Sequence, residues 1–147
     1  METLPRAFIA ALPDAATRAQ LVEYQGQMRP HAERLRWIGA ADLHLTLRFL
    51  GDTSDARLNA LQGSVDAVAQ SLPAATLHVE QAALWPPRRS SVLVLELADE
   101  PAMQACAARL EQASVALGFA AEPRSFRAHA PVSLFPRTAV TGAIAPS

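Results

Sequence analysis

Apolar and polar residues alternate strictly in one short stretch of the chain, DLHLTLRFLGD, which runs from Asp42 to Asp52. Side chains of an extended strand point to opposite faces with a period of two, so the pattern predicts a strand with one apolar face. The apolar face, which we expect in the core, comprises Leu43, Leu45, Leu47 and Phe49. The opposite face, which is either solvated surface or a functional site, carries His44, Thr46 and Arg48.

The rest of the chain divides into segments with helical spacing of apolar residues and shorter segments typical of strands. The predicted helices cover 15–28, 54–72 and 101–117, with Asp14 and Ser54 as N-caps and Gly118 as a stop. The predicted strands cover 6–12, 35–38, 76–84, 91–97 and 126–134. Each half of the chain thus contains a helix and a closing strand with a histidine. This order predicts an α+β fold, with antiparallel sheet and helices packed on its outer side.

Length and composition fit one soluble domain spanning residues 1–147, since 50% of the residues are hydrophobic and 18% are charged. The opening residues lack a membrane span and a secretion signal. The single cysteine, Cys106, excludes an internal disulfide and favours a reducing cytoplasm. We also expect no membrane partner.

Charge limits the kind of nucleic-acid contact that the chain can make. The formal net charge is −1, so a protein that coats long RNA is disfavoured and any contact with nucleic acid should be short. All basic residues are arginine. A GC-rich genome would produce this bias, and so would local use of the guanidinium for binding phosphate.

The segment RWIGAADLHLTLRFLGDT resembles the first signature of the 2H phosphoesterases, specifically the bacterial RNA 2′,3′-cyclic phosphodiesterases long labelled 2′-5′ RNA ligases. That family has two His-x-Thr-x motifs, and His44-Leu45-Thr46-Leu47 matches the first in full. The segments RAFIAALPDA, WPPRRSSVLVLEL and LGFAAEPRSFRAH also resemble the family, and the last leads into a second histidine, His129. The resemblance implies two pseudo-symmetric lobes with a cleft between them, across which the two motif strands lie side by side.

The chain departs from the family pattern at two places. Pro131 stands where the second threonine belongs, and proline has neither a hydroxyl nor a backbone N–H. A two-residue bulge after His129 would let Ser133 supply the hydroxyl instead. Members of that family also continue into further strands, so the resemblance implies that strands are missing after Ser147. The oligomeric state stays open, and an uncovered sheet edge would favour a dimer through edge strands.

Two histidines suit the opening of a 2′,3′-cyclic phosphate, because one removes a proton from water while the other protonates the leaving ribose oxygen. The resemblance implies that His44 is the proton donor and His129 the proton acceptor. The residues expected to bind substrate are Thr46, Ser133, Arg48, Arg124 and Arg127. A phosphodiester carries a single negative charge that hydroxyls and arginines can hold, so we expect no metal and no cofactor.

The expected activity is therefore hydrolysis of RNA 2′,3′-cyclic phosphodiester ends, or of small cyclic nucleotides, to a terminal 2′-phosphate. Two alternatives remain open. A degenerate family member would bind RNA ends or nucleotides without turning them over. The same site running backwards would join RNA through a weak 2′-5′ ligase reaction. Trp85 and the loop residues Arg88 and Arg89 are further candidates for RNA contacts, and His31 and His78 have no such context.

Overall fold

The computed structural model describes residues 4–31, 35–71, 76–85 and 92–134 of the chain. The loop with Arg88 and Arg89 and the segment after Leu134 lie outside the described residues. The strands are β1 (Arg6–Ala11), β2 (Arg36–Trp37), β3 (Leu45–Asp52), β4 (Val79–Trp85), β5 (Val92–Leu97), β6 (His129–Pro131) and β7 (Ser133–Leu134). The helices are α1 (Ala15–Met28), α2 (Asp55–Ser71) and α3 (Pro101–Ala116), with short 3-10 turns at Arg29–His31 and Ala40–Asp42.

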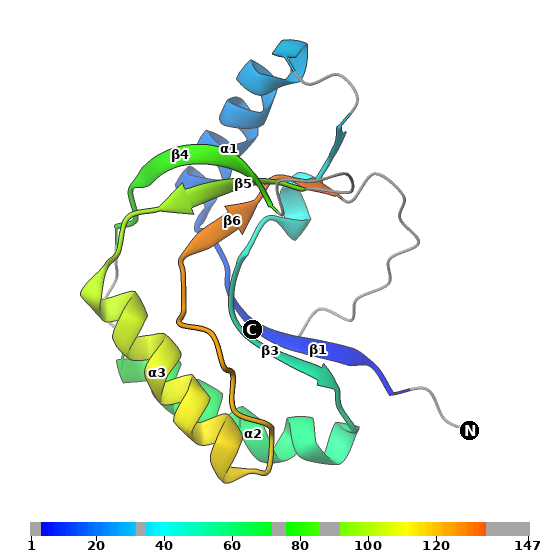
Figure 1. Cartoon of the computed structure of the whole chain (residues 1–147), viewed down its shortest axis with the longest axis vertical. Coiled ribbons are helices and arrows are strands. Elements are labelled where there is room, and N and C mark those ends of the chain that lie inside the picture. Colours follow the sequence, from blue (N-terminus) through cyan, green and yellow to red (C-terminus); the bar gives the residue numbers. More distant parts are fainter. Residues whose placement is uncertain (1–3, 32–34, 72–75, 86–91, 135–147) are drawn as a thin grey trace.

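Every strand pair in the described part of the chain is antiparallel. β1 pairs with β3, β5 lies between β4 and β6, and the short strands β2 and β7 pair with each other. Figure 1 shows β1 and β3 running together below the β4–β5–β6 sheet, with β3 passing next to β6. The predicted α+β fold with antiparallel sheets is confirmed.

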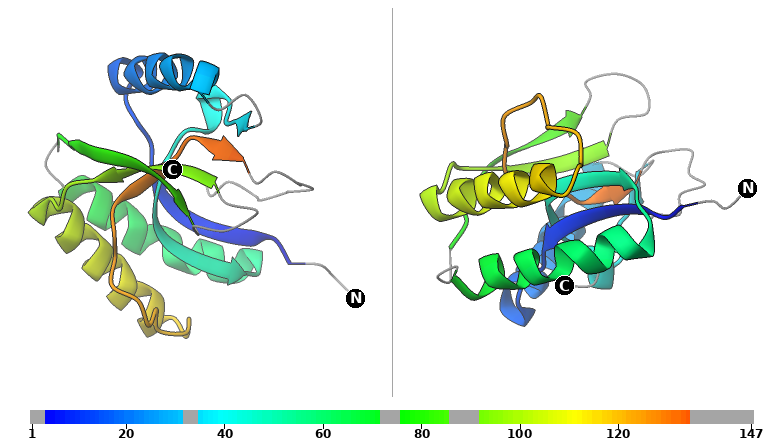
Figure 2. Two further views of the ribbon diagram at one scale, coloured as in Figure 1. Left: turned by 45° about the horizontal axis from the view of Figure 1, so that its top comes forward. Right: turned by 90° about the horizontal axis from the view of Figure 1, so that it is seen from below.

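The helices form two outer layers (Figure 2). α2 and α3 cover the β1–β3 sheet, and the core between them contains Ile9, Leu61, Val68, Cys106, Leu110 and Phe119. α1 covers the other sheet, where Leu21, Tyr24 and Met28 pack on Leu95, Ala130 and Val132. Helices therefore cover the outer faces of the β1–β3 and β4–β5–β6 sheets. α3 comes from the second half of the chain but packs on the β1–β3 sheet, which comes from the first half. No helix in the described ranges is long and apolar enough to cross a membrane.

Local capping explains where the helices begin and end. The Asp14 carboxylate accepts a hydrogen bond of 2.7 Å from the backbone N–H of Thr17, as expected of an N-cap. Ser54 similarly accepts from the N–H of Arg57. Gly118 has a φ of 92°, a left-handed conformation that favours glycine, and ends α3 as predicted.

The strict alternation expected along β3 is wrong beyond Thr46. Ile9 lies opposite Arg48 and Ala10 opposite Thr46, so Leu47 has no partner on β1 and forms a bulge. The bulge reverses the faces of Arg48 and Phe49, and a second register shift follows at Leu50. Arg48 consequently turns towards the helices and is buried, while Phe49, expected in the core, is 61% exposed.

The last predicted strand, 126–134, is shorter than expected and divided in two. β6 belongs to the β4–β5–β6 sheet, whereas β7 leaves it and pairs with β2. The division falls at Val132. Its carbonyl turns out of the β5 ladder and accepts hydrogen bonds from the N–H of Ile38 and the side-chain amide of the buried Gln25.

Candidate active site

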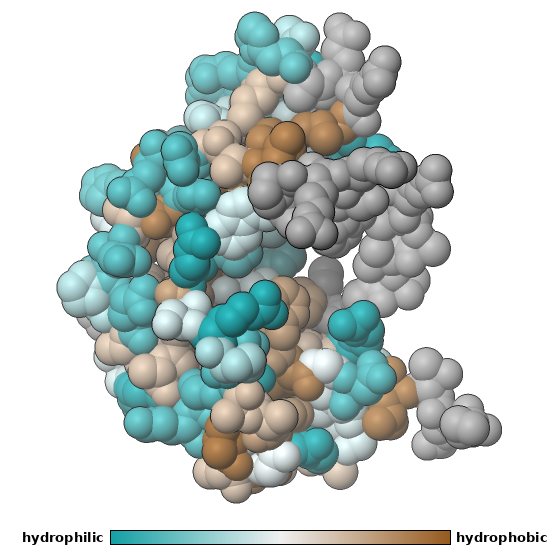
Figure 3. All heavy atoms as spheres, viewed as in Figure 1, coloured by the Kyte–Doolittle hydropathy of each residue, from teal (hydrophilic) through white to brown (hydrophobic). Residues whose placement is uncertain are grey.

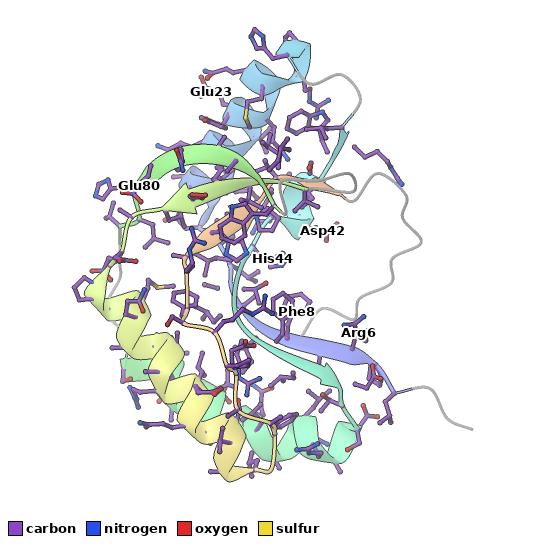
Figure 4. The ribbon with its side chains drawn as sticks, viewed as in Figure 1. Arg6, Phe8, Glu23, Asp42, His44 and Glu80 are labelled. Carbon is purple, nitrogen blue, oxygen red and sulfur yellow. The ribbon has the colours of Figure 1, made fainter. Side chains whose placement is uncertain are left out.

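His44 lies directly before β3 and is held at one ring nitrogen. Its Nδ1 is 2.7 Å from the backbone carbonyl oxygen of Asp42. A carbonyl accepts but never donates, so Nδ1 carries the proton in this bond and Nε2 is left to exchange protons with a ligand. The ring stacks on Phe8 of β1 with a centroid separation of 5.0 Å. Both side chains are labelled in Figure 4.

His129 opens β6 and is held in the same way. Its Nδ1 is 2.8 Å from the carbonyl oxygen of Arg127, which is again the residue two positions earlier. An aromatic ring from a neighbouring segment also packs on this histidine, since the centroid of Trp85 lies 4.3 Å from that of His129. The two histidines therefore have matching hydrogen bonds and matching aromatic neighbours, although they lie far apart in the sequence.

The residues flanking the two histidines bring their strands together. Leu43 shares one buried cluster with Ala130, and Leu45 shares another with Ala128. Each histidine sits between two of these inward-pointing residues, so alternation places its ring on the opposite face of its strand. β3 and β6 approach each other directly. Both imidazoles therefore project from adjacent strands on the side away from the shared clusters.

Thr46 lies two residues beyond His44, before the bulge, and shares its face. The side chain is largely buried, with 9% exposed, opposite the small residue Ala10. Its hydroxyl makes no hydrogen bond to any other residue within the described ranges. The hydroxyl is therefore available to a ligand held next to His44.

A groove of about 650 Å³ lies beside His129, lined by the two residues that precede it, Arg127 and Ala128, although neither histidine lines the groove itself. Its lining includes the aromatic ring of Trp85, the cation Arg127 and the acidic residues Glu80, Glu96 and Asp99. In Figure 3, hydrophilic residues cover much of the visible surface around the β4–β5–β6 sheet.

Glu96 is the best-connected acidic group of this groove. It accepts hydrogen bonds from the amide of Gln81 at 3.0 Å and from the indole of Trp85 at 3.1 Å, and Arg127 lies 3.9 Å away. The pKa of Glu96 is lowered, most strongly by the hydrogen bond from Gln81 and next by that from Trp85. The nearby charges of Arg127 and His129 lower it further. Glu96 is therefore ionised at neutral pH.

A sequence model described as LigT-like phosphoesterase matches residues 12–94, which is more than half of the chain and includes the first histidine motif. The chain belongs to the LigT-like phosphoesterase family. Comparison with curated protein sequences gives no match.

Solved structures of LigT-like and related proteins agree with this assignment. The chain is 27% identical to E. coli LigT in its apo form, with a TM-score of 0.72 over 95% of this chain and 77% of that one. A crystal structure described as a phosphoesterase is 26% identical, with a TM-score of 0.73 over 95% and 78% of the two chains. The protein TT0787 of Thermus thermophilus has the same fold at 22% identity, with a TM-score of 0.68 over 97% and 79%.

The second motif of this LigT-like chain keeps its histidine but not the expected hydroxyl. Ser133 is 1% exposed, and its Oγ accepts a hydrogen bond of 2.7 Å from the backbone N–H of Leu93. The Ser133 hydroxyl takes the place of the Val132 carbonyl as acceptor for the Leu93 N–H. The Val132 carbonyl instead points towards α1 and β2. The β5–β6 register is regular from His129 to Pro131, so the bulge expected after His129 is absent, and the Ser133 hydroxyl bonds to Leu93 within the sheet.

Pro131 takes the position on the face of His129 that the family's threonine would hold. Backbone hydrogen bonds join Val132 to Leu93 and Leu97 to Ala128, so the intervening pair Pro131–Val94 is one of the non-hydrogen-bonded pairs of the ladder. The backbone N–H at such a position does not bond to β5, so its absence in proline removes no hydrogen bond from the β5–β6 ladder. Proline therefore fits β6 without breaking it.

The three arginines expected to bind substrate lie in different places. Arg48 is buried, with its guanidinium bonded to the Glu111 carboxylate at 2.7 Å and to the carbonyl of Ala120, so the structure does not bring it to the histidines. Arg124 is 89% exposed and pairs with Glu122. Only Arg127 lies at the site, with its guanidinium 4.7 Å from the centroid of the Trp85 ring.

Sequence reasoning missed the aromatic neighbours of both histidines. Phe8 and Trp85 come from strands that the pattern predicts, but nothing in the spacing indicates which ring faces which histidine. The tetrad of Glu96, Trp85, Arg127 and His129 was missed for the same reason. No group of three or more residues able to ligate a metal is present in the described ranges.

Proposed function

We propose that the chain hydrolyses 2′,3′-cyclic phosphodiesters, at RNA ends or in small cyclic nucleotides, to leave a 2′-phosphate. The matched pair of histidines carries this proposal. Both rings have Nδ1 committed to a backbone carbonyl, so both have Nε2 free for proton transfer. One neutral and one protonated imidazole on opposite sides of a phosphorus atom supply the base and the acid that the reaction needs.

The family resemblance gives each ring a role. Nε2 of His129 removes a proton from water, and the water oxygen forms a bond to phosphorus. The bond from phosphorus to the ribose 3′ oxygen then breaks, and Nε2 of His44 donates a proton to that oxygen. The hydroxyl of Thr46 donates a hydrogen bond to a non-bridging phosphate oxygen, and the exposed cation Arg127 offsets the negative charge.

Nucleotide complexes of a relative support a phosphorylated ligand of this class. E. coli LigT, 26% identical to this chain in these structures, has been crystallised with 3′-AMP and with NADP⁺. Each of these molecules carries a phosphate on a ribose. We therefore propose that the same class of ligand binds between His44 and His129 here.

The test is incubation of the purified chain with a 2′,3′-cyclic nucleotide in EDTA, followed by ³¹P NMR of the products. The proposal predicts a nucleoside 2′-phosphate as the product and no effect of the chelator. A 3′-phosphate product, or hydrolysis that EDTA abolishes, contradicts it. Ligation through a 2′-5′ linkage is the same step reversed, and dilute water favours hydrolysis.

A second function is favoured by Pro131 and the inward-facing Ser133, which leave the second motif without a hydroxyl near its histidine. In this case the chain binds RNA ends or nucleotides and turns them over weakly. Titration with a non-hydrolysable cyclic phosphate analogue, next to the activity assay, separates the two functions. Binding without product supports the second, and product at many turnovers supports the first.

A further inference from the structure

The imidazole of His129 is the last member of a stack that begins at an arginine. The guanidinium of Arg127 lies 4.7 Å from the centroid of the Trp85 ring. The indole also packs on the His129 ring, at a centroid separation of 4.3 Å and an angle of 38° between the ring planes. The indole therefore limits how far the imidazole can rotate about its Nδ1 hydrogen bond.

Glu96 fixes the indole within this stack. The Nε1–H of Trp85 donates to one carboxylate oxygen of Glu96, and the amide of Gln81 donates to the other. Glu96 also lies directly opposite His129 in the β5–β6 ladder, in a non-hydrogen-bonded pair. Side chains are closest together in such pairs, so carboxylate, indole and imidazole occupy one small region of the sheet.

The His44 side has no equivalent of this carboxylate within the described residues. Its aromatic neighbour is Phe8, a hydrocarbon ring without a hydrogen-bond donor, and Phe8 packs on Phe49 rather than on a charged group. The two histidines therefore share a backbone hydrogen bond and an aromatic neighbour, but the surroundings of the two aromatic rings differ. Trp85 donates a hydrogen bond to Glu96 of β5, whereas Phe8 has no donor.

We propose that Glu96 is a positioning residue for His129, because its carboxylate holds the Trp85 indole and the indole sets the plane of the imidazole. This inference rests on the proposed function, in which His129 must direct Nε2 at the water that attacks phosphorus. Glu96 itself does not touch substrate. The lowered pKa of Glu96 supports the arrangement, since an ionised acceptor makes a stronger bond to the indole N–H.

The variants Glu96→Ala, Glu96→Gln and Trp85→Phe test the proposal by steady-state hydrolysis of a 2′,3′-cyclic nucleotide. Misplacement of a reacting group by about 1 Å costs up to about 100-fold in rate. We expect Glu96→Ala and Trp85→Phe to lower kcat by about 10- to 100-fold with little change in KM. Glu96→Gln keeps an acceptor for the indole and should recover most of the loss.

The matched control is Glu80→Gln, which removes a negative charge from the same groove at a side chain that is exposed on β4. Its kcat should stay within about twofold of the wild type. A loss of kcat in Glu80→Gln as large as that in Glu96→Ala would overturn the proposal, because groove charge rather than position would then decide the rate. Unchanged kcat in Glu96→Ala would overturn it too.

A second measurement does not depend on activity. With Trp37→Phe as background, Trp85 is the only tryptophan, and a protonated imidazole in contact with an indole quenches its fluorescence. Emission should therefore depend on pH, and Glu96→Ala should weaken that dependence while Glu96→Gln preserves it. A pH dependence of emission that is the same in His129→Gln would overturn the positioning inference. An inactive wild type with intact quenching would instead contradict the proposed function and leave the contact itself established.

Discussion

At the scale of single residues, the site depends on which nitrogen of each histidine is engaged. The carbonyl oxygens of Asp42 and Arg127 hold Nδ1 of His44 and of His129, respectively. Side chains alone do not enforce this arrangement, because the acceptor is in each case the backbone two residues earlier. In both cases the orienting group is therefore the backbone that directly precedes the histidine motif.

Replacing either histidine by alanine should remove one proton-transfer step. We expect His44→Ala and His129→Ala each to lower kcat/KM for a 2′,3′-cyclic nucleotide by about 10²- to 10⁴-fold. His78→Ala is the matched control, since His78 is exposed and lies outside the site, and it should retain full activity. A loss below about tenfold for either of the first two variants would contradict its role.

Thr46 is expected to bind the phosphate through its hydroxyl. Thr46→Val keeps the shape of the side chain and removes the donor, so kcat/KM should fall by about 10- to 100-fold, the value of a hydrogen bond to a charged group. Thr46→Ser keeps the hydroxyl and should stay close to the wild type in the same assay. Equal activity of the valine and serine variants would show that the hydroxyl is not used.

The sequence was sufficient to propose His44 and His129 as catalytic candidates, because the motif and the run into the second histidine are local patterns. It was not sufficient for Phe8, Trp85 or Glu96. Their place beside the histidines depends on strand register, which joins residues far apart in the chain. The inward turn of Ser133 depends on where one carbonyl, that of Val132, finds its partners.

At the scale of elements, one unpaired residue in β3 decides which side chains face the site. The bulge at Leu47 turns Arg48 towards α3, where it pairs with Glu111, and exposes Phe49. A period of two is a sound guide only where a strand is regular. The expected strands and helices otherwise agree with those of the structure to within a few residues, because apolar spacing, caps and stops are local signals.

Arg48 should therefore contribute to stability rather than to substrate binding. Arg48→Met removes the ion pair with Glu111 and the hydrogen bond to the carbonyl of Ala120, and we expect the free energy of unfolding in urea to fall by about 1.5–3 kcal/mol. KM for the cyclic nucleotide should be unchanged. Arg6→Met, at an exposed position at the start of β1, should leave stability unaltered. A raised KM with unchanged stability would return Arg48 to the substrate site.

A threonine in place of Pro131 in β6 should increase activity. Pro131 occupies a non-hydrogen-bonded position on the face of His129, so Pro131→Thr would restore a hydroxyl without adding a donor to the β5 ladder. We expect kcat/KM to rise by about tenfold. Pro131→Val adds no hydroxyl and should show no such rise. Equal rates for the two variants would mean that a second hydroxyl has no place in this site.

At the scale of the whole molecule, the site depends on the junction between two sheets. Leu43, directly before the first motif, packs with Ala130 and Val132 of the second, and α1 covers this cluster from outside. The pattern of the chain predicts each sheet but not this junction, because buried residues from distant segments look alike in sequence. The family resemblance supplied the expectation that the two motif strands lie side by side.

Shortening a side chain at this junction should therefore affect stability and activity together. Leu43→Ala and Leu61→Ala both remove buried leucine atoms, and each should lower the free energy of unfolding by about 2–5 kcal/mol. Leu61 lies in the α2–α3 core, away from the histidines. Below the unfolding transition, only Leu43→Ala should lower kcat. Similar kcat values for the two variants would contradict the role of the junction.

The central claim is that both imidazoles reach one phosphate. A crystal structure of the chain with a nucleoside 2′-phosphate bound measures this directly. The account predicts Nε2 of His44 and Nε2 of His129 each within about 2.6–3.2 Å of an oxygen of that ligand, on opposite sides of the phosphorus. A phosphate that contacts only one of the two rings, or that binds away from both, would contradict it.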